Sequence, residues 1–391
     1  MDRSKRKIIL SCISLCTFPG AIALLINKLD EDCADVVNLE GYKGKIEIDD
    51  SNLASGTDIG SATNSESLKS TNNKAVAIAR CESKVPLVYS AKYNFKLLAF
   101  EKLHSFDSKK YAKIANTLIK EKKRTSSEFH NPEELKRALL LKVHTKDYLD
   151  SLSDSRVLSR ILEVPILSLV PSPILDWRLL FPMRLASGGS LKACREAMKN
   201  GLAINIGGGY HHADRNKGGG FCVYCDGPIS LKVMKEEGLI KRALIVDTDA
   251  HQGNGFANVA RTERFLSVLD FFDESVYPYP KVDEDFSVPL PRCTDGPKYL
   301  SELKRMLPFV LDKIEPDLVF YNAGSDVLVT DPLATLRLTV DDMVRRDLYV
   351  VTECRKRSIP LAMALAGGYG PESAIAHTKS IKTLLETFDP V

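Results

Sequence analysis

Four short apolar runs alternate with amphipathic segments in the second half of the chain, and this alternation restricts the possible folds strongly. The apolar runs are Leu202–Ile206, Ala243–Val246, Leu318–Tyr321 and Leu361–Leu365. Helical periodicity marks the segments between and after them, at Ile229–Glu237, Lys298–Ile314, Val340–Arg357 and Glu372–Phe388. Strands that alternate with helices are typical of a mostly parallel sheet covered by helices on both faces. The sequence therefore predicts a three-layer α/β/α fold, with ligands bound at the carboxyl ends of the strands.

The segments before the first of these runs are less regular. Ser108–Glu121 and Pro132–Val143 have helical periodicity, and Gly189–Lys199 predicts a helix that Asn200-Gly201 would end. Leu158–Phe181 is rich in proline and leucine without a clear period, and we expect a surface loop there.

The amino-terminal part differs in composition from the rest of the chain. In residues 1–27, four basic side chains precede an uncharged run, 8–26, which is just long enough to span a bilayer. A membrane anchor and a cleaved signal are both possible, and we favour a membrane-associated amino terminus. Residues 28–83 include a polar stretch low in aromatic residues and are predicted to be a disordered linker. Residues 84–391 have the composition of a globular domain, which we predict to be catalytic.

Charge and cysteine patterns exclude two classes of function. The chain carries 54 basic and 51 acidic residues. A net charge of +3 is too small an excess of positive charge to indicate direct nucleic-acid binding. Cys222 and Cys225 form a lone C-x-x-C without the second pair that a zinc ribbon needs. We interpret both as ordinary buried thiols.

The run Ala243–Gly255 ends in a pattern that is hard to explain by packing. Asp247, Asp249 and His251 occupy alternate positions, so in an extended segment their side chains leave the same face. Buried carboxylates cost free energy unless they are paired or bind a cation, and Asp and His are ligands that suit zinc. The alternative is that the aspartates cap the next helix.

The other strand ends carry complementary groups. Asp326 follows one strand and can complete a three-ligand set with Asp249 and His251. His211 and His212 follow another, where imidazoles suit proton transfer, and Tyr369 follows a third with a phenol that can donate to an oxyanion. Each has a structural alternative. His211 and His212 could be a structural pair, Asp326 could cap the turn after its strand, and Tyr369 could be a core residue. Together these groups favour metal-assisted hydrolysis of a carbonyl.

These segments resemble a known family. GGGYHHADRNKGGGFC, IVDTDAHQGNG, NAGSDVLVTDPL and LAGGYG are similar to the motifs of zinc-dependent histone deacetylases, and the D-A-H-Q-G-N-G form is similar to class IV. The opening segment VYSAKYNFKLLAFEKLHSFDSKKY also resembles that branch, so the likeness covers about residues 85–391. It implies an arginase/deacetylase-like fold, an acyl-lysine protein substrate and a location in the nucleus or cytoplasm.

The resemblance also implies a role for each matching residue. Asp249, His251 and Asp326 would bind the catalytic Zn²⁺, His211 and His212 would transfer protons, and Tyr369 would polarise the acyl carbonyl. Asp247 would be the partner of His211 and would help to bind a structural K⁺. The residues implied for the acyl-lysine tunnel are Gly220, Phe221, Leu333, Gly367 and Gly368.

Three positions depart from the class I pattern. Asn254 stands where an aspartate would pair with His212, so we expect a lower pKa for His212. Leu333 replaces a methionine, and Gln252 replaces a second histidine. Class IV resembles long-chain deacylases as much as deacetylases, so both activities are expected. The alternatives are a non-catalytic scaffold of the corepressor type and an amidohydrolase of acylated polyamines.

Overall fold

The computed structural model describes residues 83–95, 107 and 109–390. The chain divides into two units, and all described residues belong to the second, Ala77–Val391. The predicted hydrophobic segment 1–27 and all but the last residue of the predicted linker 28–83 lie outside the described residues.

One eight-stranded sheet forms the centre of the described fold. Its order is β2-β1-β3-β8-β7-β4-β5-β6, and every neighbouring pair is parallel. The strands are β1 (Leu87–Val88), β2 (Phe129–His130), β3 (Leu202–Asn205), β4 (Ala243–Asp247), β5 (Leu266–Asp273), β6 (Phe286–Leu290), β7 (Leu318–Asn322) and β8 (Leu361–Ala364). The four apolar runs in the second half of the sequence are the four central strands, β3, β8, β7 and β4.

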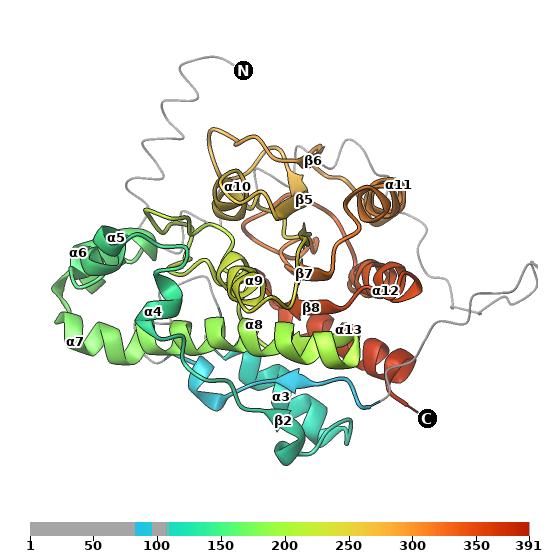
Figure 1. The fold of residues 1–391 in the computed structure, drawn as a ribbon, viewed down its shortest axis with the longest axis horizontal. Coiled ribbons are helices and arrows are strands. Elements are labelled where there is room, and N and C mark those ends of the chain that lie inside the picture. Colours follow the sequence, from blue (N-terminus) through green and yellow to red (C-terminus); the bar gives the residue numbers. More distant parts are fainter. Residues whose placement is uncertain (1–82, 96–106, 108, 391) are drawn as a thin grey trace, which may run out of the picture. The chain divides into compact units, whose positions relative to one another are not determined.

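Helices cover both faces of this sheet, as Figure 1 shows for α11 and α12 on one side and α9 and α10 on the other. The first layer contains α3 (Lys110–Lys120), α11 (Gly296–Ile314), α12 (Val340–Lys356) and α13 (Ser373–Phe388). The second contains α8 (Phe181–Asn200), α9 (Asp226–Glu236) and α10 (Asn254–Ala260). Shorter helices lie beside the second layer: α4 (Arg137–Leu140), α5 (Lys146–Ser151), α6 (Ser155–Ile161) and α7 (Ser172–Leu175). The predicted three-layer α/β/α fold is confirmed.

The alternation of side chains along β4 explains why the sheet needs both layers. Leu244 and Val246 pack into the core beneath α11 and α12. Ala243 and Ile245 point to the opposite face and pack into the core beneath α8 and α9. Each of these side chains is fully buried, so a continuous apolar run, rather than an alternating one, is what a strand covered on both faces requires.

Helix ends follow the local sequence signals. Gly201 ends α8 with a left-handed φ of 80°, which a glycine adopts without steric cost, so the predicted stop signal is confirmed. Asp295 caps α11 by accepting a bond from the Lys298 backbone N–H at 3.0 Å. Thr339 and Asp342 form a capping box at the start of α12.

The predicted surface loop Leu158–Phe181 was wrong. It contains the end of α6, the helical turns η4 (Pro165–Leu169) and η5 (Asp176–Leu180), α7 and the first residue of α8. Leu162, Leu167 and Leu179 are buried, because the segment folds back onto the body of the protein. The five residues of η4 are too few to show a period of 3.6. From Ser172 the chain is helical without a break into α8, and the π-helical segment η5 disturbs the regular period there.

The predicted membrane-associated location is corrected here. Among residues 83–95 and 109–390, no helix is both long and apolar enough to cross a bilayer. Residues 8–26, on which that prediction depended, lie outside the described residues.

Candidate active site

The carboxyl ends of the four central strands meet at one edge of the sheet. Asp247 at the end of β4 is in register with Asn322 on β7, and Asn322 is in register with Ala364 on β8. Ala364 is in turn in register with Asn205 on β3. The segments that follow these strands therefore bring the predicted site residues together.

Three ligand-type side chains form a buried cluster at this edge. Asp249, His251 and Asp326 each offer a ligand atom, and these atoms lie within 4.8 Å of one another. His251 Nδ1 is 2.9 Å from Asp326 Oδ2 and 3.3 Å from Asp249 Oδ1. The ligand atoms of a tetrahedral zinc with bonds of about 2.0–2.1 Å lie roughly 3.3 Å apart, so the donor set fits such an ion.

Charge also favours a cation between these groups. Burial and the neighbouring Asp249 carboxylate raise the pKa of Asp326 to about 7. Two carboxylates this close repel each other without a positive charge between them. A divalent cation would remove that conflict.

Contacts around the cluster fix the orientation of each ligand. His251 Nε2 donates to the carbonyl oxygen of Leu333 at 3.2 Å, so Nδ1 is the nitrogen that faces the carboxylates and that a cation between them would bind. Asp326 Oδ1 accepts from the Ala250 backbone N–H at 2.8 Å. Asp249 Oδ2 accepts from the Gly367 N–H at 2.9 Å, and a Cβ at position 367 would lie only 2.5 Å from that oxygen. This close approach requires glycine.

The two adjacent histidines lie beside the cluster with different partners. Their ring centroids are 4.0 Å apart. His211 Nδ1 contacts Asp247 Oδ2 at 2.9 Å, whereas His212 Nδ1 contacts the amide oxygen of Asn254 at 2.7 Å.

The surroundings of the two imidazoles give them different pKa values. Burial opposes a charge on His211, but the carboxylates of Asp247 and Asp249 outweigh it and raise the pKa of His211 to about 9. Burial and the charge of His211 hold the pKa of His212 well below its usual value. The expectation that Asn254 gives His212 a lower pKa than an aspartate would stays a prediction. The pKa values of the two imidazoles are therefore shifted in opposite directions.

A residue absent from the sequence predictions holds the histidine turn. The buried carboxylate of Asp226 accepts from the backbone N–H groups of Gly209 at 2.9 Å and Tyr210 at 2.8 Å, and from the Ser190 hydroxyl at 2.5 Å. The charge of a buried aspartate is satisfied by these donors. Asp226 lies just before the predicted helix Ile229–Glu237, where an aspartate has a simpler explanation as a cap, so the sequence carried no distinct signal.

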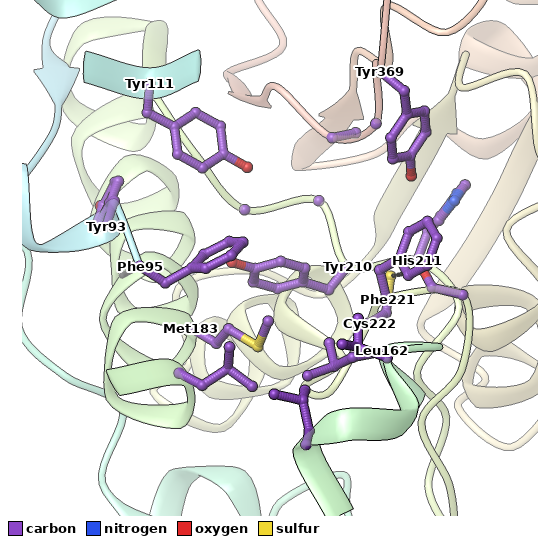
Figure 2. A pocket seen from close by; sticks show the side chains of 18 residues that line it. Tyr93, Phe95, Tyr111, Leu162, Met183, Tyr210, His211, Phe221, Cys222 and Tyr369 are labelled. Carbon is purple, nitrogen blue, oxygen red and sulfur yellow. Dashed lines mark hydrogen bonds between the residues drawn. The ribbon is translucent and has the colours of Figure 1, made fainter. Parts of the chain in front are cut away.

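Tyr369 lies opposite the histidines. Its ring centroid is 6.4 Å from that of His251 and 5.7 Å from that of Phe221. Figure 2 shows its hydroxyl end pointing toward the side of the cavity where His211 and Phe221 lie. Burial and the negative charge of Asp249 raise the pKa of Tyr369, so its phenol stays protonated and can donate a hydrogen bond.

An apolar cavity reaches these groups (Figure 2), with an empty volume of about 870 Å³ that includes its open mouth. Aromatic and aliphatic side chains dominate its wall, which is formed by Tyr93, Phe95, Tyr111, Leu162, Val164, Leu167, Leu179, Met183, Gly208, Gly209, Tyr210, His211, Gly220, Phe221, Cys222, Ala366, Gly367 and Tyr369. Of the predicted tunnel residues, Gly220, Phe221 and Gly367 line the cavity. Leu333 and Gly368 do not: Leu333 contacts His251, and Gly368 packs against Ser325 and Ser373.

Tyr277 is a further residue that the sequence did not indicate. Its ring stands edge-on to His212 at a centroid distance of 4.8 Å, and 41% of the residue is exposed. Its loop is tied to the metal-ligand segment, because the Gln252 side chain exchanges two hydrogen bonds with the Val282 backbone. Tyr277 therefore stands between solvent and the histidine pair.

The C-x-x-C cysteines take no part in a metal cluster among the described residues. Cys222 and Cys225 are free and buried, and burial raises the pKa of both thiols. The predicted burial of both thiols is confirmed.

The fold and this arrangement define a class of protein: an α/β/α hydrolase with a candidate metal centre at the carboxyl ends of a parallel sheet. Comparison with known proteins identifies the family within that class. Residues 104–385 match the histone deacetylase domain. The chain therefore belongs to the histone deacetylase family.

Relatives and solved structures agree with this assignment. The chain is 35% identical over 307 residues to histone deacetylase 2 of Arabidopsis thaliana, covering 77% of this chain and 79% of the relative. It is 27% identical over 203 residues to a probable deacetylase of Methanothermobacter thermautotrophicus, covering 49% of this chain and 60% of the relative. The crystal structure of an HDAC homologue complexed with SAHA has the same fold, with a TM-score of 0.63 at 21% identity, covering 79% of this chain and 85% of that one.

Proposed function

We propose that residues 84–391 form a zinc-dependent hydrolase that removes acyl groups from N-ε-acyl-lysine in histones or other proteins, and that the chain belongs to the class IV branch. The observation that carries this proposal is the buried Asp249–His251–Asp326 cluster beside the histidine pair, in which His211 contacts Asp247 and His212 contacts Asn254. A related structure that binds SAHA supports an acyl-lysine site, and Gln252 and Asn254 support the branch.

The donor set suits zinc better than a harder cation, because it contains an imidazole and only two carboxylates. When bound, zinc would supply Lewis acidity to the acyl carbonyl and to a water molecule. Asp249, His251 and Asp326 would hold the ion, and Leu333 would keep His251 in the tautomer that presents Nδ1.

The two histidines take different steps of proton transfer. The Nδ1–H of His212 donates to Asn254, which leaves the Nε2 lone pair free to accept a proton from the attacking water. His211 is charged at neutral pH, so it stabilises negative charge and delivers a proton to the leaving amine. Tyr369 donates its phenol proton in a hydrogen bond to the oxyanion that forms on the acyl carbon. The products are a lysine amine and a carboxylate.

We expect Asn254→Asp to move the pH dependence of turnover. A general base works only when it is deprotonated, so kcat/KM falls as the pH drops through the pKa of His212. The pKa of His212 is held well below its usual value, so this acidic limb lies at low pH in the natural protein. A carboxylate at position 254 stabilises the charged imidazole and shifts the limb to higher pH. The measurement is kcat/KM against pH.

Asn200→Asp is the matched control, because it adds the same charge at the end of α8, before β3 begins. An acidic limb that stays in place or moves to lower pH in Asn254→Asp would remove His212 from the role of base.

The apolar cavity supports long acyl chains as substrates. Met183 lies in its wall and not among the polar groups of the site. Met183→Trp narrows the cavity, so we expect kcat/KM for tetradecanoyl-lysine peptides to fall about tenfold or more while acetyl-lysine turnover changes little. Met198→Trp, near the other end of α8, is the control. Equal losses on both substrates would contradict a chain-binding role for the cavity.

A structural monovalent cation near Asp247, such as K⁺, is also proposed. Asp270 is in register with Asp247 across β4 and β5. Asp270 Oδ1 and both carboxylate oxygens of Glu284 are buried without a hydrogen-bond donor. Burial and the charge of Glu284 raise the pKa of Asp270, as expected where a counter-ion is needed.

An amidohydrolase of acylated polyamines is the second candidate, and one observation favours it. Glu163 is exposed between the cavity-lining residues Leu162 and Val164, and its backbone adopts a left-handed φ of 57°. An acidic group at the rim suits a second ammonium on the substrate.

One experiment separates these functions. Lysine peptides with acyl chains of increasing length and an acetylated polyamine are assayed on one sample, together with its zinc content. We expect one zinc per chain and turnover of the peptides. Preferential turnover of the polyamine would favour the second candidate, and a zinc-loaded protein inactive on all substrates would favour a corepressor-type scaffold.

A further inference from the structure

The loop that carries Tyr369 has an unusual backbone. It runs from Ala366 to Gly370 between β8 and α13, without regular secondary structure. Ala366 has a left-handed φ of 50°, and Gly368 has a φ of 123°. A non-glycine residue in this region is strained, and strain persists only where the surroundings hold it. The contacts that hold this loop therefore determine where the phenol lies.

Besides Asp249, which accepts from the Gly367 N–H, a second buried carboxylate binds the part of the loop that carries Tyr369. Asp331 Oδ2 accepts from the backbone N–H groups of Tyr369 at 2.7 Å and Gly370 at 3.0 Å. Its other oxygen accepts from the Leu333 N–H at 2.9 Å. The Leu333 carbonyl in turn accepts from His251 Nε2. Asp331 thus connects the tyrosine loop to the segment that orients a metal ligand.

A buried cation binds the same loop through its carbonyl groups. The Lys110 ammonium donates to the carbonyl oxygens of Ala366 at 2.9 Å and Gly367 at 2.8 Å. Only 1% of Lys110 is exposed, and it comes from α3, far from the loop in sequence. Charge-assisted hydrogen bonds of this kind are shorter and stronger than neutral ones. Oppositely charged side chains therefore hold adjacent parts of one five-residue loop.

We propose that Asp331 and Lys110 are positioning residues that hold the Tyr369 phenol at the distance from the metal ligands that hydrolysis requires. This inference rests on the proposed function. Neither side chain acts on the substrate; both act through the backbone that carries Tyr369. Of the two residues, Asp331 should have the larger effect on the position of the phenol. It binds the backbone N–H of Tyr369 itself and also reaches the Leu333 segment.

Asp331→Asn is the substitution that tests this positioning role most specifically. An amide has one acceptor oxygen, and its NH₂ group meets N–H donors on whichever side it faces. Either the Tyr369 or the Leu333 contact is therefore lost while volume is preserved. We expect kcat to fall on the order of tenfold to a hundredfold, because small displacements of a catalytic group have effects of this size. KM and zinc content should change little.

A double-mutant cycle separates positioning from general damage. If Asp331 acts through the Tyr369 phenol, Asp331→Asn should cost little further activity in a Tyr369→Phe background. Equal fold losses in both backgrounds would overturn the proposal. Lys110→Met removes the donors and keeps most of the apolar stem. It should give the same pattern, and it replaces Asp331→Asn as the test if that variant does not fold.

The control is Asp342→Asn. Asp342 is as buried as Asp331, at 7% exposure, and accepts bonds from Thr339 at the start of α12. The Asp342→Asn variant should have a lower melting temperature and an unchanged kcat.

A second readout does not depend on turnover. Hydrogen–deuterium exchange of the peptide that contains residues 366–370 should be faster in Asp331→Asn than in Asp342→Asn. Unchanged exchange would overturn the positioning role. A natural protein without activity on any acyl-lysine substrate would instead reject the proposed function, while the exchange result would still decide whether Asp331 holds the loop.

Discussion

Replacing Asp326 with alanine is expected to abolish zinc binding and turnover together. In the proposed centre Asp326 supplies one of three protein ligands, and no other carboxylate of the described residues belongs to the cluster with Asp249 and His251. A site with two remaining ligands, Asp249 and His251, should lose the ion on gel filtration. The measurement is zinc per chain by mass spectrometry, on the same sample as the activity assay.

Natural protein stripped of metal by a chelator is the matched control for this variant. Both should be inactive and folded by circular dichroism, and added zinc should restore only the natural protein. If Asp326→Ala kept one zinc per chain, Asp326 would not be a ligand, and the assignment of the whole cluster would fail with it.

Tyr369→Phe should retain zinc and lose turnover. The variant keeps the ring, and hence the packing against Phe221, but removes the hydroxyl that points toward the histidine side of the cavity. Loss of one preorganised oxyanion donor typically lowers kcat by about 10²–10³-fold. Because the bond strengthens as charge develops on the acyl oxygen, kcat should fall much more than KM rises.

Steady-state kinetics with zinc content measured in parallel tests this role. The raised pKa of Tyr369 keeps the phenol protonated across the physiological range, so the loss should be independent of pH there. A variant with an unchanged rate would leave the oxyanion to other groups.

The central part of the fold could be predicted because local sequence patterns specify its strands. The four central strands are continuous apolar runs, and each ends at a glycine-containing turn. Once these strands are parallel, the groups that follow them must meet at one edge, and the cluster of Asp249, His251 and Asp326 is a consequence of topology. Strands β5 and β6 were not predicted: acidic residues interrupt the first and Pro289 the second.

The surroundings of the site could not be predicted, because they depend on contacts between distant segments. Lys110 is one of several lysines in a predicted helix, and only the fold places its ammonium on the Ala366 and Gly367 carbonyls. Asp331 resembles an ordinary turn residue before a proline. The leucines of 158–181 lack periodicity, so their place in the cavity wall follows from tertiary packing alone.

Anomalous diffraction on either side of the zinc absorption edge would test the account most directly. Crystals of the zinc-loaded protein should show one strong peak enclosed by Asp249 Oδ, His251 Nδ1 and Asp326 Oδ, each at about 2.0–2.2 Å. A peak elsewhere, or a side chain of Asp326 turned away from the ion, would contradict a hydrolase built on these three ligands.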